Sequence, residues 1–298
     1  MFDGFCMKPV AGSGGRPTWL KMARFLVPVL IVCSVSALTG CLSMAKPSRG
    51  VREEAFARAA KDLAAHRSEL QKVTFLVYAS DSPAAFDFAN HGDKIDMHFE
   101  SRELFSGLAT GISSDGYLLT AAHVVKAHCY VAGWMGGQQI VAPARVVYQE
   151  SGDEFGEDLA ILHVDEPLDS AIRLGKLDPA ENEVYAFSCD REPEVKIIVV
   201  AGKILHGPEA TPKGDLSIMD MDLPLWIGDS GSAVMTKEGR QVGVFVGISG
   251  SRMKLSISRV ACVPDMDRVL AIIEKDRAES REKSQSLQSA PAGNGGAP

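Results

Sequence analysis

The sequence lacks the features that mark several common functional classes. Its 298 residues carry a formal net charge of −7 and no stripe of clustered basic side chains. Because phosphate backbones need cations to neutralise them, we expect no nucleic acid among the partners. No pair of cysteines or histidines has the spacing of a metal site, and we expect neither a metal nor a cofactor. The composition, 46% hydrophobic and 23% charged, is ordinary for a folded protein.

A hydrophobic run of comfortable membrane-spanning length is missing as well. The uncharged run Phe25–Leu38 is largely apolar, but a membrane span needs about 20 residues. Its length suits the core of a signal peptide, which is about 7–15 residues, and basic residues precede it. The residues Leu38-Thr39-Gly40-Cys41 that follow resemble a bacterial lipobox, in which the cysteine is acylated and becomes the mature amino terminus. We therefore predict cleavage before Cys41 and attachment to a membrane through the lipidated Cys41.

Other interpretations of this amino-terminal region stay open. Val35-Ser36-Ala37 would also serve an ordinary signal peptidase, the apolar run could remain as an uncleaved anchor, and Met22 could be the true start. Under the lipoprotein interpretation, Leu42 rather than Asp follows the cysteine. Among lipoproteins of double-membraned bacteria this favours the outer membrane, so we predict a cell-envelope protein that faces the periplasm.

Few cysteines remain once the predicted leader and Cys41 are set aside. They are Cys129, Cys189 and Cys262. An odd number in an oxidising compartment permits one disulfide with one spare thiol, and three buried free thiols are the alternative.

Helical patterns stand only at the two ends of the predicted mature chain. Residues 42–71 are predicted to form a tether followed by a helix at Arg52–Gln71, with Phe56, Ala60, Leu63 and Leu70 on one face. A closing helix is predicted over residues 265–278. Residues 279–298 are poor in apolar side chains and are predicted to be a disordered tail.

Between these helices the pattern is one of short strands separated by turn residues. Asp115-Gly116 between two apolar runs indicates a hairpin, since Gly accepts positive φ without a steric penalty. This regular spacing favours an all-β barrel or sandwich. The main strand candidates are Lys72–Ala79, Ala144–Tyr148, Leu159–Val164, Glu183–Ser188 and Val195–Leu205.

Three polar residues have the chemistry of serine-dependent hydrolysis. Ser230 lies in Gly228-Asp-Ser-Gly-Ser232, where glycines allow the tight turn that exposes a nucleophile. His123 ends Thr120-Ala-Ala-His and could act as the base. Asp158 begins an apolar strand and could orient that base.

These motifs resemble those of the trypsin/chymotrypsin-like serine peptidases, especially the bacterial HtrA-type branch, over residues 104 to 265. The resemblance implies two antiparallel six-stranded β-barrels, about 72–178 and about 183–265, within a peptidase domain at 72–278. It also implies that Ser230 is the nucleophile, His123 the general base and Asp158 the orienting carboxylate. The backbone amides of Gly228 and Ser230 would form the oxyanion hole.

The chain departs from that family in several ways. In zymogen-activated trypsins, the Asp before the nucleophile pairs with a newly cut amino terminus, but no Ile-Val-Gly-Gly-like start occurs near Phe105. Asp229 must therefore find another partner or remain solvated. Ser232 replaces the usual Gly, and no room follows residue 265 for the PDZ domains common in HtrA enzymes.

Specificity is predicted from the segments that would line the substrate pocket. The stretch before the nucleophile lacks the Asp that trypsins place at the pocket base, and Pro224 and Leu225 stand near that position. Val246-Gly247-Ile248 resembles the strand that pairs with substrate. Ala261 is placed on the opposite wall. These residues predict a small or medium apolar side chain at P1, the substrate residue whose carbonyl is attacked.

The sequence thus predicts a serine endopeptidase that cleaves polypeptides through an acyl-enzyme. The alternative is a catalytically silent lipoprotein of the same fold that binds or scaffolds. A third reading is a peptidase that stays latent until a partner engages the Ser80–Glu100 loop or the amino-terminal helix.

Overall fold

The computed structural model describes residues 46–83, 105–151, 158–190, 196–210, 216–251 and 256–289. The predicted signal peptide, the lipobox with Cys41 and most of the Ser80–Glu100 loop lie outside the described residues. Within the described ranges, no helix combines the length and the apolar character that crossing a bilayer requires.

The first barrel is closed and antiparallel, as predicted. Its strands follow the order β1-β2-β3-β6-β5-β4 around the barrel. Their bounds are Thr74–Ser80 for β1, Phe105–Gly111 for β2, Tyr117–Thr120 for β3, His128–Met135 for β4, Gln138–Ser151 for β5 and Asp158–His163 for β6. The predicted hairpin turn joins β2 to β3, and Gly116 has a φ of 102° there.

The second barrel follows the order β11-β8-β9-β10-β13-β12 and closes through a further pairing of β11 with β12. Its strands are β8 (Glu183–Asp190), β9 (Lys196–Ala210), β10 (Leu216–Met221), β11 (Ala233–Met235), β12 (Arg240–Ser251) and β13 (Ser256–Pro264). A two-residue strand, β7 (Arg173–Leu174), pairs in parallel with the start of β12. The prediction of two six-stranded barrels is confirmed.

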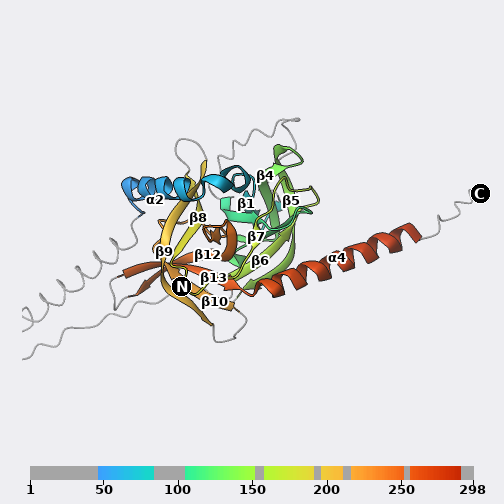
Figure 1. Cartoon of the computed structure of the whole chain (residues 1–298). Coiled ribbons are helices and arrows are strands. Elements are labelled where there is room, and N and C mark those ends of the chain that lie inside the picture. The colour runs from blue at the N-terminus through green and yellow to red at the C-terminus, as the bar shows by residue number, and fades with distance from the viewer. Residues whose placement is uncertain are drawn as a thin grey trace, which may run out of the picture. The chain divides into compact units, whose positions relative to one another are not determined.

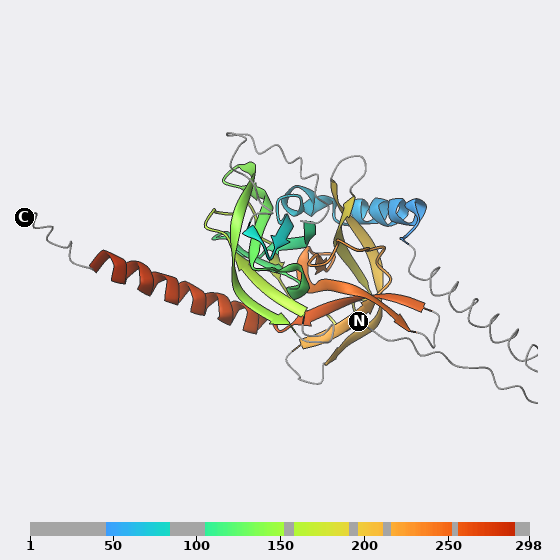
Figure 2. The same cartoon turned by 180° about the vertical axis from the view of Figure 1, so that it is seen from behind.

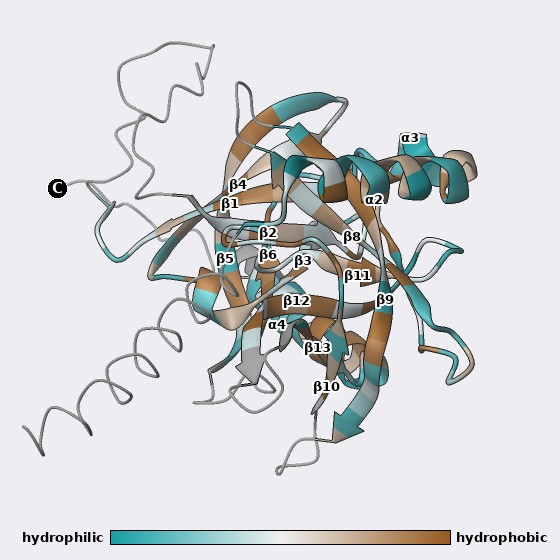
Figure 3. Ribbon diagram, turned by 90° about the vertical axis from the view of Figure 1, so that its left-hand side faces the viewer, coloured by the Kyte–Doolittle hydropathy of each residue, from teal (hydrophilic) through white to brown (hydrophobic). Residues whose placement is uncertain are grey.

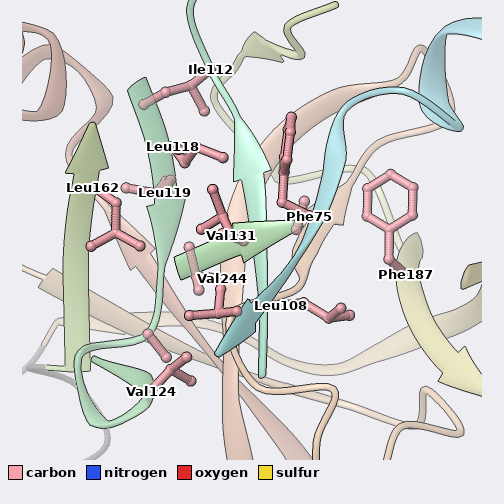
Figure 4. Packing of buried hydrophobic residues seen from close by; sticks show 14 of the residues in the cluster. Phe75, Leu108, Ile112, Leu118, Leu119, Val124, Val131, Leu162, Phe187 and Val244 are labelled. Atoms are coloured by element: carbon pink, nitrogen blue, oxygen red, sulfur yellow. The ribbon is translucent and has the colours of Figure 1, made fainter. Parts of the chain in front are cut away.

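Apolar side chains fill the interior of the barrels, and the hydropathy colouring concentrates hydrophobic residues on the strands (Figure 3). Phe75, Leu118, Val131 and Leu162 are fully buried and point toward one another from different strands of the first barrel (Figure 4). Burial of each such side chain contributes about 1.5–3 kcal/mol, which fixes which face of every strand points inward.

The amino-terminal helix lies against the second barrel, beside β9 (Figure 1). It consists of α2 (Arg49–Asp62), a 3-10 turn (Ala64–His66) and a short α3 (Arg67–Leu70). Ala55 and Ala59 face the barrel, whereas Phe56 is 38% exposed. Phe56, Ala60, Leu63 and Leu70, predicted to share one face of the helix, all line a cavity of about 260 Å³ between the helix and β8–β9. The shared face is therefore confirmed, although Phe56 stays partly open to solvent.

The carboxy-terminal helix α4 (Met266–Ser289) packs on the first barrel and extends beyond it (Figures 1 and 2). Residues 279–289, predicted to be disordered, continue this helix, which corrects that boundary. Polar contacts near the middle of α4 hold it to the first barrel: Asp276 accepts hydrogen bonds from Tyr117 (2.9 Å) and Arg145 (2.8 Å), and Arg277 pairs with Asp115 (2.6 Å).

Cys129, Cys189 and Cys262, the three cysteines of the predicted mature domain, are all buried, and no disulfide joins any two of them. The alternative of one disulfide among these three is therefore not realised.

Candidate active site

His123 and Asp158 come together at one end of the first barrel. His123 lies in a 3-10 turn, Ala122–Val124, that follows β3, and Asp158 is the first residue of β6, which pairs with β3. The His123 Nδ1 lies 2.5 Å from Asp158 Oδ2, and the His123 backbone amide donates to Asp158 Oδ1 at 2.8 Å. One carboxylate thus holds both the ring and the backbone of the histidine. A Nδ1–H directed at the carboxylate leaves Nε2 as the basic atom.

Solvent exposure differs between the two members of this pair. The His123 side chain is 48% exposed and the Asp158 side chain 14%. The imidazole can therefore meet a substrate from outside while its partner stays shielded, which strengthens the attraction between the carboxylate and a protonated ring.

Ser230 lies in a turn of the second barrel that is fastened to the first barrel. Gly228 and Gly231 on either side have φ values of 96° and 87°, in the region that other residues rarely adopt. The Leu108 amide on β2 donates to the Ser230 carbonyl at 2.7 Å. A Cβ on Gly231 would come within 1.9 Å of the Leu108 carbonyl oxygen, so only glycine permits this approach.

The turn that carries His123 (Ala122–Val124, the histidine turn) and the turn that carries Ser230 (Gly228–Ser232, the serine turn) meet at Gly107. A Cβ added there would lie 2.4 Å from the Ser230 carbonyl oxygen and 2.8 Å from a methyl group of Val124, the residue after His123. The three predicted catalytic residues are thus brought into one region between the barrels. Among the described residues, no hydrogen bond joins the Ser230 hydroxyl to the imidazole. Such contacts are often long in unliganded enzymes and shorten when substrate binds.

Some backbone N–H groups in the serine turn donate hydrogen bonds within the protein, and others have no acceptor among the described residues. The Asp229 amide donates to Trp226 (3.0 Å) and the Gly231 amide to Phe245 (2.8 Å). The amides of Gly228 and Ser230, the predicted oxyanion donors, make no hydrogen bond within the part of the chain that the structure describes. Two donors flanking the nucleophile are therefore available to a ligand oxygen.

Asp229, next to the nucleophile, is buried with only 3% exposure. Its Oδ1 accepts from the Cys189 amide (2.7 Å), and its Oδ2 accepts from the Trp226 amide (2.8 Å) and the Ser188 hydroxyl (3.0 Å). Burial raises the pKa of the Asp229 carboxyl to about 6, although these hydrogen bonds and the charge of Arg52 act in the opposite direction. The carboxylate thus ties the serine turn to β8.

A cation from the amino-terminal helix completes this arrangement. Arg52 of α2 donates to the Ser188 hydroxyl at 2.9 Å, and Ser188 in turn donates to Asp229. Its side chain is 11% exposed, and it lies 3.8 Å from Asp190. Asp229 therefore is not solvated, and its link to a positive charge runs through Ser188. Nothing in the sequence connects Arg52 to the serine motif, because the fold alone brings residues so distant in the chain together.

The predicted specificity residues are divided between core and surface. Leu225 and Ala261 are fully buried, and Val246 is 3% exposed. Gly247 and Ile248 are half-buried and lie next to Val246 on β12. Only the last two have appreciable accessible surface.

A charged residue near these positions was missed in the sequence. Arg259 of β13 donates from Nε to the Leu225 carbonyl at 3.2 Å. Its signal in the sequence is a single cation directly before the apolar run Val260–Val263, inside the strand β13. Such a lone cation does not by itself mark a functional residue.

Within the described ranges, no group of three or more His, Cys, Asp or Glu residues is arranged to hold an ion.

Comparison with known proteins agrees with this architecture. Residues 106–244 match the family model of the trypsin-like peptidase domain. The fold is the trypsin-like one, the matched segment is similar to a trypsin-like peptidase domain, and HtrA-type serine proteases are among the structural neighbours. The comparison with curated proteins found no match.

Three solved structures illustrate the similarity. The HtrA-type protease AlgW with a tripeptide is 21% identical, with a TM-score of 0.50 over 74% of this chain and 64% of its own. A serine endoprotease from Yersinia pestis is 18% identical (TM-score 0.48, 74% and 65%). The protease Rv3671c from M. tuberculosis is 16% identical (TM-score 0.46, 78% and 88%). At these identities the similarity concerns the fold.

Proposed function

We propose that the protein is a serine endopeptidase that hydrolyses polypeptides through an acyl-enzyme, with Ser230, His123 and Asp158 as its catalytic triad. The observation that carries this proposal is the meeting at Gly107 of the histidine turn, already bonded to Asp158, and the serine turn with its two available amides.

The chemistry follows from the roles that these groups can take. Ser230 Oγ attacks the substrate carbonyl carbon while His123 Nε2 accepts the hydroxyl proton. The amides of Gly228 and Ser230 stabilise the oxyanion, and Asp158 stabilises the imidazolium. His123 then gives the proton to the leaving amine, and the acyl-enzyme forms as the peptide bond breaks. Water, deprotonated by His123, attacks the ester, and the acid product leaves as Ser230 regains its proton.

The substrate class and the location belong to the same proposal. Solved neighbours include the HtrA-type protease AlgW with a decapeptide and with a tripeptide, which supports polypeptides as substrates. The pattern around Cys41 supports export and a lipid anchor in the cell envelope, facing the periplasm.

An active-site-directed fluorophosphonate tests the nucleophile directly. The full-length protein should be labelled covalently, and Ser230→Ala should abolish labelling. Ser114→Ala is the control, because Ser114 is an exposed serine in a turn of the first barrel and should leave labelling unchanged. Equal labelling of Ser230→Ala and wild type would refute the assignment.

The silent binding lipoprotein remains the second candidate. It is favoured by the missing hydrogen bond between the Ser230 hydroxyl and His123 among the described residues. A folded wild-type protein that binds peptides and resists the fluorophosphonate would establish it.

A further inference from the structure

Arg259 lies beside two segments that the sequence predicts to contact substrate. On β13 it lies opposite Ile248 of β12, one of the predicted substrate-binding residues with accessible surface. Its Nε donates to the carbonyl of Leu225, in the segment that leads into the serine turn. The guanidinium is therefore placed between the two segments from which the P1 pocket was predicted.

The electrostatic state of Arg259 is unusual for this molecule. The side chain is half-buried, and this desolvation lowers the pKa of its guanidinium. Within the described residues it forms no ion pair with a carboxylate. Asp222 acts on it only through its charge, and Asp222 is itself exposed.

Other arginines with partly shielded side chains are paired with acids. The ion pairs join Arg145 to Asp276, Arg268 to Glu150 and Arg277 to Asp115. Such pairing is the general rule, since taking a cation out of water costs free energy that a carboxylate restores. Among the described residues, the hydrogen-bond partner of Arg259 is the Leu225 carbonyl oxygen alone, which leaves its remaining N–H donors for an acid supplied from elsewhere.

We propose that Arg259 is the specificity-determining residue of the pocket and selects substrates with glutamate or aspartate at P1. This inference rests on the proposed function and replaces the apolar P1 residue expected from the sequence. The guanidinium presents parallel N–H groups that match a carboxylate in a bidentate contact, and partial burial strengthens that contact. A lysine or arginine at P1 would be repelled by the same charge, so the site discriminates in both directions.

Binding to the Ser230→Ala protein tests the selectivity without relying on turnover. Four peptides that differ only at one residue, Glu, Gln, Leu or Lys, are compared by calorimetry. The Glu peptide should bind about 10- to 100-fold more tightly than its Gln counterpart, the range expected for hydrogen bonds to a charged group. Equal affinity of the Glu and Gln peptides, or a preference for Leu, would overturn the proposal.

Variants of Arg259 then assign the effect to this residue. Arg259→Met, built in the Ser230→Ala protein, should make the Glu and Gln peptides equivalent, whereas Arg259→Lys should retain a reduced preference. Arg240→Met is the matched control, because Arg240 is an exposed cation on the neighbouring strand β12 and should leave the preference intact. If Arg259→Met does not fold, Arg259→Lys serves as the test. A Glu-over-Gln preference in Arg259→Lys equal to that of the Ser230→Ala protein with Arg259 intact overturns the assignment.

Kinetics on the active protein separate this inference from the proposed function. Wild type should cleave the Glu peptide with a kcat/KM about 10- to 100-fold above that for the Gln peptide. Fluorophosphonate labelling without this ratio overturns the role of Arg259 alone. Selective binding of the Glu peptide without any labelling overturns the peptidase activity and still supports the carboxylate-binding role of Arg259.

Discussion

The two halves of the candidate site are held in different ways. On the first barrel, His123 is bonded directly to Asp158, and the histidine is half exposed. On the second barrel, the position of Ser230 depends on Asp229, a buried carboxylate with three hydrogen-bond donors, one of which is held by Arg52 from a separate helix.

The difference shows where each half is vulnerable. The histidine needs only the pairing of β3 with β6 to find its carboxylate. The serine turn needs the second barrel, the buried charge of Asp229 and the docking of α2. Changes to Asp158 should therefore affect chemistry with little loss of structure, whereas changes around Asp229 should affect stability and activity together.

The largest effect is expected from Asp158→Asn. An amide in this position donates toward Nδ1 and favours the tautomer whose Nε2 carries the proton, which cannot act as a base. We expect kcat to fall about 1,000- to 10,000-fold with little change in KM. Asp165→Asn is the control, because Asp165 is a fully exposed acid at the end of the same strand. Steady-state kinetics at neutral pH measure both, and a wild-type rate in Asp158→Asn would exclude Asp158 from the triad.

A smaller effect, on the pH dependence of the free energy of unfolding, is expected from Asp229→Asn. Its pKa is about 6 in the folded protein and about 4 in an unfolded chain. Between those pH values the folded protein binds more protons, so its free energy of unfolding falls as the pH rises from about 4 to about 6 and then levels off. The decline is on the order of 3 kcal/mol and should be missing in Asp229→Asn.

Urea unfolding of both proteins across this pH window measures the contribution. The informative quantity is the difference between wild type and Asp229→Asn at each pH, because the variant also loses hydrogen bonds at every pH. A difference that stays constant, or that moves in favour of wild type as the pH rises, would contradict the raised pKa.

The smallest effect is expected from Arg52→Met. Loss of the guanidinium frees the Ser188 hydroxyl to turn away from Asp229, which loosens the serine turn. We expect fluorophosphonate labelling to slow about 10-fold, corresponding to about 1.4 kcal/mol. Arg49→Met is the matched control, because the Arg49 side chain on the same helix is 92% exposed and pairs with Glu53. Equal labelling rates for the two variants would show that α2 does not support the turn.

Local sequence patterns determined much of the architecture. Asp115-Gly116 specified a hairpin through the positive φ of its glycine, and the short apolar runs specified strands. Ser230 and His123 were identifiable because their chemistry requires particular neighbours, namely glycines around a nucleophile and a strand end before a base. Each of these signals lies within a few consecutive residues and can therefore be identified without knowledge of the fold.

Only the tertiary structure decided the contacts between distant segments. Arg52 meets Ser188, and Arg259 meets the Leu225 carbonyl, through interactions that no local pattern records. Leu225 and Ala261, predicted to contact substrate, are fully buried in the second barrel. The sequence by itself thus determined the strands and the reactive groups, because hydrophobic periodicity and turn chemistry are local. The partners of the buried charges depended on how the barrels and helices pack, since desolvation and pairing are properties of the assembled interior.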